Sequence, residues 1–132
     1  MKDFIKTNDL KEILEIAGEN LIRPDAYHVL IKVFCPEEKT EAGLMLTEKT
    51  REDAISICVV GLVLKKGPAA YQKIDKQGNK YFDDWDKCEV GDWIIFREAS
   101  GPLLKMSKLP VRLIPDDAIL AHINDPSTVT RD

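Results

Sequence analysis

The chain has 132 residues, of which 44% are hydrophobic and 32% are charged. This length fits one domain, and this composition allows a packed core beneath a charged surface, which argues against a wholly disordered chain. The formal net charge is −4 at pH 7, so the surface has no overall attraction for phosphate backbones and no nucleic-acid partner is expected.

The apolar stretches are too short to cross a membrane. The longest, residues 55–64, is interrupted by Ser56 and Gly61 and falls short of the roughly 20 residues that span a bilayer. The chain begins Met1-Lys2-Asp3-Phe4, whereas a signal peptide needs a cationic lead and an apolar block. We therefore expect no membrane partner and a cytoplasmic location.

An amphipathic helix is predicted near the N-terminus. Asp9 is placed to cap its first turn, with Glu12 as a capping-box partner, and Gly18 supplies a stop. The helix packs on the domain or docks onto another protein, and the pattern leaves both alternatives open. The apolar residues that recur at helical spacing are Leu10, Ile13, Leu14, Ala17 and Leu21.

From Ile22 onward the apolar period falls to two, which is typical of strands with one face toward a core. Pro110 and Pro115 punctuate the later strands, and residues 76–80 are a predicted hairpin tip. Several short strands without intervening helices predict a small antiparallel barrel or sandwich. The candidate strands are residues 27–33, 55–64, 93–96, 111–114 and 118–123.

One segment between the first two candidate strands fits neither period. Residues 36–53 are charged on both sides of the apolar island Leu44-Met45-Leu46. A connection of this length in a compact domain is usually functional or mobile, and charged flanks bury too little apolar surface to order it. We expect it to move in the free protein; the alternative is that the island forms a short strand entering the core.

No catalytic, metal or cofactor site is predicted, and we expect that the protein is not an enzyme. His28 and His122 have no partner at motif spacing, and the acidic run at 83–92 matches no calcium loop and is interpreted as a solvated turn. No phosphate-binding glycine motif is present. Three widely spaced cysteines, interpreted as small apolar core residues, are Cys35, Cys58 and Cys88.

Four motifs follow one another along the chain. They are Ile22-Arg23-Pro24 with the strand at 27–32; the segment 38–47, in which Gly43 precedes the apolar tripeptide; residues 61–68, which end in Gly67-Pro68; and residues 89–96, with 117–121 closing the series. In this order and separation they resemble the co-chaperonin family, the GroES-like ten-kilodalton lids of group I chaperonins. The resemblance covers roughly residues 22–123.

The resemblance implies an all-β fold, a small GroES-like partial β-barrel with an extra N-terminal helix and an enlarged roof hairpin. The corresponding organisation is a helical extension at 1–20, a barrel domain at 21–124 and a polar tail at 125–132. Within the barrel domain, a mobile loop is expected at 37–53 and the roof hairpin at 69–87.

The resemblance also implies a function, a heptameric lid that binds an ATP-dependent, GroEL-like group I chaperonin and encloses a folding substrate protein. The chaperonin-binding residues are then Gly43, Leu44, Met45 and Leu46. Neighbouring subunits of the homo-oligomer then meet through Ile22, Arg23 and Pro24 on one side and Ile119, Leu120 and Ala121 on the other. No metal or cofactor is implied.

The chain also departs from the family pattern. The tripeptide reads Leu-Met-Leu where the family often has Ile-Val-Leu, and the helix and the larger hairpin are additions. These differences resemble divergent, virus-encoded lids, for which the location is the host cytoplasm. The alternative function is a structural or adaptor subunit, for example of a virus particle, that uses the same barrel without binding a chaperonin.

Overall fold

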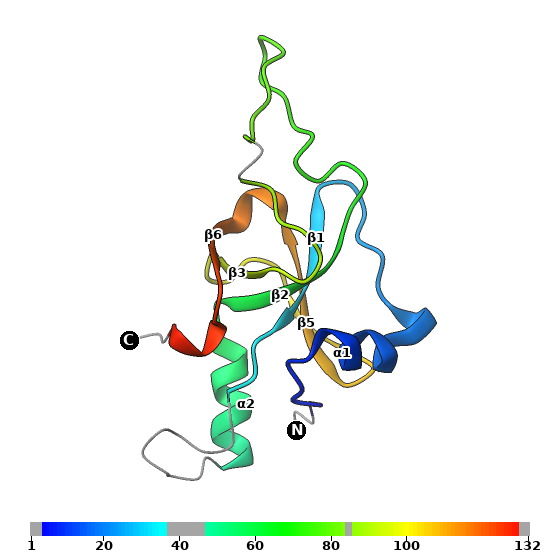
Figure 1. The fold of residues 1–132 in the computed structure, drawn as a ribbon, viewed down its shortest axis with the longest axis vertical. Coiled ribbons are helices and arrows are strands. Elements are labelled where there is room, and N and C mark those ends of the chain that lie inside the picture. Colours follow the sequence, from blue (N-terminus) through cyan, green and yellow to red (C-terminus); the bar gives the residue numbers. More distant parts are fainter. Residues whose placement is uncertain (1–3, 37–46, 84–85, 130–132) are drawn as a thin grey trace.

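The computed structural model describes residues 4–36, 47–83 and 86–129. Its centre is one antiparallel sheet, in the strand order β4-β5-β1-β2-β3-β6, that curves into an open partial barrel (Figure 1). The expected all-β partial barrel with a helix at its N-terminus is therefore confirmed. The helices and strands are α1 (Leu10–Ala17), β1 (His28–Val33), α2 (Glu48–Ile57), β2 (Val60–Lys66), β3 (Trp93–Phe96), β4 (Leu103–Met106), β5 (Leu109–Pro115) and β6 (Ile119–Ile123).

Strand β1 lies at the centre of the sheet and is covered on both faces. It pairs with β2 on one side and β5 on the other, and every residue after His28 is buried. The expected alternation between a core face and a solvent face is wrong for β1, because other segments cover the second face. Even Lys32 has no exposed surface.

Among the described residues, three apolar clusters form the interior. The barrel core contains Val29, Ile31, Val63, Ala70, Tyr71, Phe82, Cys88, Ile94, Phe96, Ile114 and Ala118. The α1 core contains Ile13, Ala17, Leu30, Leu62, Leu64, Met106, Leu109 and Val111. The α2 core contains Phe4, Val33, Cys35 and Ile55.

Helix α1 forms where the 3.6-residue period predicts it. The Asp9 carboxylate caps it by accepting from the Glu12 N–H at 3.1 Å, and the helix ends at Gly18, which has a φ of 52°. The predicted reciprocal bond is wrong, because the Asp9 N–H donates to the Thr7 hydroxyl instead. The apolar face of α1, with Ile13 and Ala17 buried, packs on the α1 core.

Two short elements differ from the predicted pattern. Residues 48–53 were expected within the loop and Ile55 in a strand, but Glu48–Ile57 is helix α2, and the following strand begins at Val60. The Thr47 hydroxyl caps α2 by accepting from the Thr50 N–H at 3.0 Å. Residues 48–53 are mostly charged, and such a composition fits either a loop or a capped helix. The spacing of apolar residues therefore did not distinguish the two.

Strand β4 was also not predicted. It pairs with β5 across a turn at Ser107 and Lys108, which both have positive φ. Pro110 lies within β5 and does not interrupt it. Proline is tolerated where its missing N–H removes no ladder bond, and β5 continues through it to Pro115.

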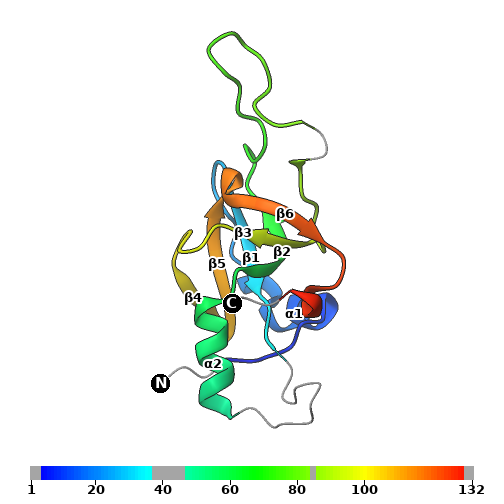
Figure 2. The ribbon, with the colours of Figure 1, turned by 90° about the vertical axis from the view of Figure 1, so that its left-hand side faces the viewer.

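The enlarged hairpin projects from one end of the barrel, and α2 lies at the opposite end (Figures 1 and 2). The tip of the hairpin is at 75–79. There the Asp75 carboxylate accepts from the N–H groups of Gln77 and Asn79, and Gly78 has a φ of 83°. One bridge, Ile74 to Lys80, joins its arms. The predicted hairpin tip is confirmed.

Candidate functional site

Strand β6 forms an outer edge of the sheet. It pairs with β3, and in the described part of the chain no strand pairs with its other side. The register joins Ile95 to Ala121 and Phe96 to Ile119, so Leu120 is the extra residue of a β-bulge. The Leu120 side chain is 61% exposed. An edge strand with unpaired backbone groups and an exposed leucine is a surface that can accept another strand.

The apolar side chains of the predicted interface motif at 22–24 are largely covered within the subunit. Pro24 is buried, and Ile22 is half-buried against the α1 core. The Ile22 N–H donates to the Met106 Sδ at 3.3 Å. Only the Arg23 side chain of this predicted interface motif is exposed. The structure therefore leaves β6 as the more accessible of the two predicted interface segments.

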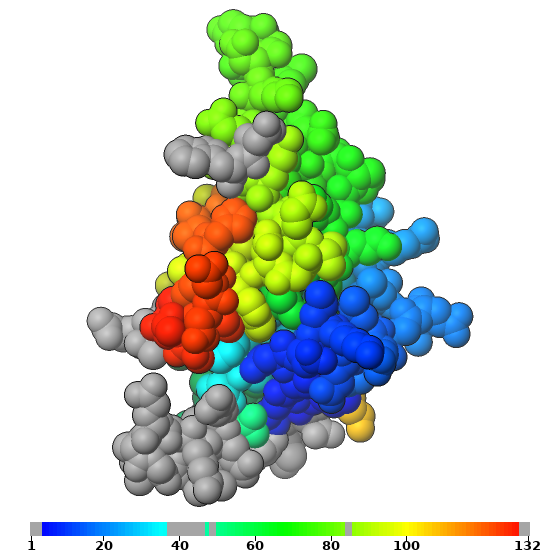
Figure 3. Space-filling view, in the orientation of Figure 1, coloured from blue at the N-terminus to red at the C-terminus, as the bar shows by residue number. Residues whose placement is uncertain are grey.

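The two predicted interface segments lie on different elements of one subunit. Residues 22–24 lead into β1 near α1, and Ile119, Leu120 and Ala121 lie on β6. Figure 3 shows β6 and the following residues as one outer side of the molecule, with the hairpin projecting above it. The two segments are therefore separate surfaces of one subunit.

A small cavity of about 90 Å³ adjoins β6. Its wall includes the Asp116 carboxylate, which is 4% exposed and accepts the Tyr71 N–H at 2.8 Å. This bond holds Tyr71 at a φ of 63°, a left-handed conformation that is uncommon for an aromatic residue. The carboxylate thereby fixes the base of the hairpin to the start of β6.

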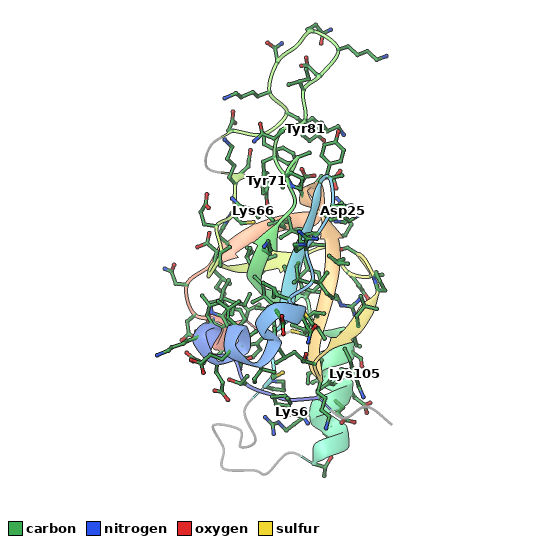
Figure 4. The ribbon with its side chains drawn as sticks, turned by 90° about the vertical axis from the view of Figure 1, so that its right-hand side faces the viewer. Lys6, Asp25, Lys66, Tyr71, Tyr81 and Lys105 are labelled. Atoms are coloured by element: carbon green, nitrogen blue, oxygen red, sulfur yellow. The ribbon has the colours of Figure 1, made fainter. Side chains whose placement is uncertain are left out.

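Aromatic rings fill the space between the barrel and the hairpin. Phe82 meets Tyr71 edge-to-face at 4.9 Å between ring centroids and Tyr81 in the same way at 5.0 Å. Figure 4 shows Tyr71 at the top of the barrel and Tyr81 further along the hairpin. Lys73 lies over the Tyr81 ring at 4.7 Å. This packing joins the base of the hairpin to the barrel core through Tyr71 and Phe82.

The predicted chaperonin-binding residues, Gly43, Leu44, Met45 and Leu46, lie outside the described residues. Their flanks are described and are tied to each other. The Arg51 guanidinium, on α2, donates to the Pro36 carbonyl oxygen from Nε at 3.2 Å and from Nη2 at 3.0 Å. The two described flanks, Pro36 and the start of α2, therefore lie together at the α2 end of the barrel.

Two further contacts hold these flanks in place. The Asn8 side chain pairs with both backbone groups of Cys35, accepting from its N–H at 2.9 Å and donating to its carbonyl at 2.8 Å. Arg112, on β5, donates to the carbonyl oxygens of Ser56 at 3.0 Å and Gly101 at 2.8 Å. Asn8, Arg51 and Arg112 were not singled out from the sequence, because each acts on backbone atoms that are distant along the chain.

Three of the residues considered for chemistry, His28, Asp86 and Asp92, have structural partners. His28 Nδ1 contacts the Asp25 carbonyl oxygen at 3.1 Å in an exposed turn. Asp86 and Asp92 cap turns by accepting from the N–H groups of Asp83 and Glu89, each at 2.8 Å. In residues 4–36, 47–83 and 86–129, no group of three or more His, Cys, Asp or Glu side chains could hold a metal ion. Nor does any helix in those ranges have the length and apolarity to cross a membrane.

Comparison with known proteins decides the family. The family model described as the chaperonin 10 kDa subunit matches residues 21–123. The chain belongs to this co-chaperonin family. A stretch of 75 residues is also 36% identical to the chloroplastic 20 kDa chaperonin of Arabidopsis thaliana. That stretch is 57% of this chain and 27% of the relative, so the chain matches only about a quarter of the relative's length.

Family membership confirms the resemblance drawn from the four motifs. The matched residues start just after α1, so the N-terminal helix precedes the family domain. In this family member, that helix completes the α1 core, and Leu10, Ile16 and Leu21 pack against the same cluster.

Proposed function

We propose that this family member is a co-chaperonin subunit, seven copies of which form a ring-shaped lid on a group I chaperonin. The lid binds through residues 43–46 when the chaperonin holds nucleotide, and it encloses a folding substrate protein. The proposal assigns no catalytic residue and no cofactor to this chain.

One observation carries the proposal, namely where the described flanks of the segment 37–46, which contains residues 43–46, lie on the barrel. Pro36 and Thr47 lie with α2 at one end of the barrel, and the hairpin projects from the other (Figure 2). In a ring of parallel subunits, all the binding segments start on one side and all the hairpins lie on the opposite side. That arrangement suits a lid, with one rim for the partner and one roof.

The exposed β6 edge supports assembly into a ring. Its free backbone groups and the Leu120 side chain offer a strand-pairing surface, which a neighbouring copy satisfies through the segment before its own β1. Because the two contacting segments differ, the contact is head-to-tail and generates a closed ring when the rotation between copies closes.

Energetics explain why such a lid needs several copies. Burying Leu44, Met45 and Leu46 in a partner groove contributes roughly 1.5 to 3 kcal/mol each. Ordering the segment costs on the order of 1 to 2 kcal/mol per residue, so one segment binds weakly. Once one segment is seated, the others bind at high effective concentration, and avidity exceeds single-site affinity by about 10² to 10⁴. Weak individual contacts keep the lid reversible when nucleotide changes the partner.

Size-exclusion chromatography of the protein with a group I chaperonin, with and without ATP, tests this proposal. Co-elution only with nucleotide supports the lid. The Met45→Asp variant should lose co-elution while keeping its circular dichroism spectrum and its ring mass, because a carboxylate cannot enter an apolar groove. Val90→Asp, at a residue 48% exposed on the barrel, is the control and should still co-elute. Loss of the folded barrel in Met45→Asp would instead support the island as a core strand.

The adaptor alternative predicts binding that is indifferent to nucleotide. Two features favour it, the N-terminal helix and the enlarged hairpin, because lid function explains neither of them. In the structure the apolar face of α1 is buried in its own subunit, with Ile13 fully inaccessible. This face is therefore not available to another assembly, and we favour the co-chaperonin.

A further inference from the structure

Lys32 is a buried cation whose hydrogen-bond partners carry no charge in their ordinary forms. Its side chain has no exposed surface. The Nζ atom contacts Asn8 Oδ1 at 2.9 Å and Cys35 Sγ at 3.2 Å. Burying an ammonium group is costly unless it is paired, so such a group either loses its proton or takes an anion as its partner.

Transfer of one proton between Cys35 and Lys32 would satisfy either requirement. A thiol beside a neutral amine and a thiolate beside an ammonium are two states of the same pair, Lys32 and Cys35. Burial lowers the pKa of Lys32, and the thiol groups of Cys35 and Cys58 oppose that shift. At 3.2 Å, the Lys32 Nζ atom is close enough to Cys35 Sγ to take the thiol proton.

Cys58 packs against the α2 core, which contains Cys35, and is partly exposed at the surface. It lines a cavity of about 290 Å³. The Phe34 N–H donates to the Val60 carbonyl at 2.9 Å, which holds the chain around Cys35 beside the chain around Cys58. An oxidant as small as a peroxide can therefore reach Cys58 from the cavity, with Cys35 next to it in the interior.

We propose that Cys35 and Cys58 are a redox-active pair, with Lys32 as the base for Cys35, and that a peroxide converts the pair to a disulfide. The Cys58 sulfur attacks one peroxide oxygen, the O–O bond breaks, and Cys58 sulfenic acid and one water form. The Cys35 thiol then gives its proton to the Lys32 amine, and its thiolate attacks Cys58 Sγ. The S–OH bond breaks, and the departing hydroxide takes the proton from Lys32 to give a second water.

The disulfide would join the end of β1 to α2. Cys35 follows β1 by two residues, and Cys58 is the C-cap of α2. Oxidation therefore makes the present non-covalent contact between these elements permanent until a thiol reductant restores it. This inference does not depend on the co-chaperonin role, because it concerns chemistry within one subunit.

The third cysteine is a matched internal control. Cys88 is as buried as Cys35, but its neighbour is the Tyr71 hydroxyl, which donates to its Sγ at 3.3 Å. It lies in the barrel core and not in the α2 core. If burial alone set the reactivity of these thiols, Cys35 and Cys88 would react alike.

The test treats the full-length protein with hydrogen peroxide, blocks free thiols with iodoacetamide after denaturation, and maps the peptides by mass spectrometry. We expect a Cys35–Cys58 linked peptide that dithiothreitol removes, together with an alkylated Cys88. Cys88→Ser should form the bond at the wild-type rate, and Cys58→Ser should not form it. Three outcomes would each overturn the proposed Cys35–Cys58 redox pair: three free thiols after peroxide, a disulfide that involves Cys88, or a disulfide between two chains.

The role of Lys32 has its own readouts. Lys32→Met should slow disulfide formation at least about tenfold, because the attacking sulfur then lacks its base. An unchanged rate in this variant overturns the role of Lys32. Since the substitution lies in the core and could disturb folding, the wild-type protein supplies a second measurement. With limiting iodoacetamide under native conditions, Cys35 should be alkylated faster than Cys88. Equal or slower alkylation of Cys35 overturns the proposal that Lys32 acts as its base.

Discussion

Arg51 and Pro36 are joined by a two-pronged hydrogen bond that links the first turns of α2 to the chain leaving β1. The guanidinium donates twice to one carbonyl oxygen, at 3.2 and 3.0 Å. These residues lie on either side of the segment 37–46. The contact therefore holds the two described flanks of that segment together, and we expect this to reduce the loop-closure entropy that chaperonin binding must overcome.

Replacing Arg51 by alanine tests this clamp. We expect a loss of about 1 kcal/mol in the free energy of unfolding, since two bonds to a partly exposed carbonyl are lost. We expect the free energy of chaperonin binding to fall by more than this loss for one subunit, because every copy in the ring loses its Arg51 contact. Calorimetric titration of the chaperonin in the presence of ATP measures the affinity, and urea unfolding measures the stability.

Arg51→Lys is the matched variant for this experiment. It keeps the charge but not the two-pronged geometry, so its affinity should fall between those of the wild type and Arg51→Ala. If Arg51→Ala binds as tightly as the wild type, the clamp has no role in binding.

The β6 edge makes a prediction about assembly. Leu120→Asp should leave a folded single subunit, because a carboxylate and its hydration shell at an exposed bulge oppose strand pairing with a neighbour but disturb no buried contact. Native mass spectrometry should show the mass of one chain where the wild type shows seven.

Ile57→Asp is the control, since Ile57 is 60% exposed, close to the 61% of Leu120, but lies on α2 and not on the edge strand. It should keep the wild-type mass. Retention of the ring by Leu120→Asp would show that copies meet through another surface.

The N-terminal helix makes a prediction about stability. Ile13→Ala should lower the free energy of unfolding by about 2 to 5 kcal/mol, because it removes a fully buried side chain from the α1 core. Urea denaturation followed by tryptophan fluorescence measures the change. Glu15→Ala, on the exposed side of the same helix, should change stability little. Equal effects of the two substitutions would contradict the packing of α1 on the barrel.

Cys88 makes a prediction about alkaline pH. Burial raises the pKa of its thiol, although the Tyr71 hydroxyl bond lowers it in part. Above about pH 8.5 the unfolded chain loses the thiol proton while the folded protein keeps it. The unfolded state then binds fewer protons, so stability falls as pH rises, by up to about 1.4 kcal/mol per pH unit for this group.

The comparison of the wild type with Cys88→Ala isolates this effect. Urea unfolding under reducing conditions, at pH values from about 7 to about 10, should show that the stability difference between the two proteins changes little at neutral pH. Above about pH 8.5 it should shift steadily against the wild type. A difference that does not vary with pH would contradict a raised pKa for Cys88.

Local patterns along the chain were enough to predict the elements that depend on neighbours in sequence. Helix α1 follows from the spacing of Leu10, Ile13 and Ala17, because residues three and four apart share one side of a helix. The hairpin tip follows from Gly78, which adopts positive φ without steric cost. The order of the four motifs predicted the family, which the match over residues 21–123 confirms.

Tertiary structure alone decided what covers each of these elements. The alternation in β1 predicts an outward lysine at position 32, but Asn8 from the N-terminal segment covers that face and turns Lys32 into an interior group. Helix α2 escaped prediction because Ile55, which anchors it, packs on Phe4 and Val33, which are far away in sequence. The spacing of apolar residues shows which side of a segment prefers to be buried. Only the folded chain determines which other segment covers that side.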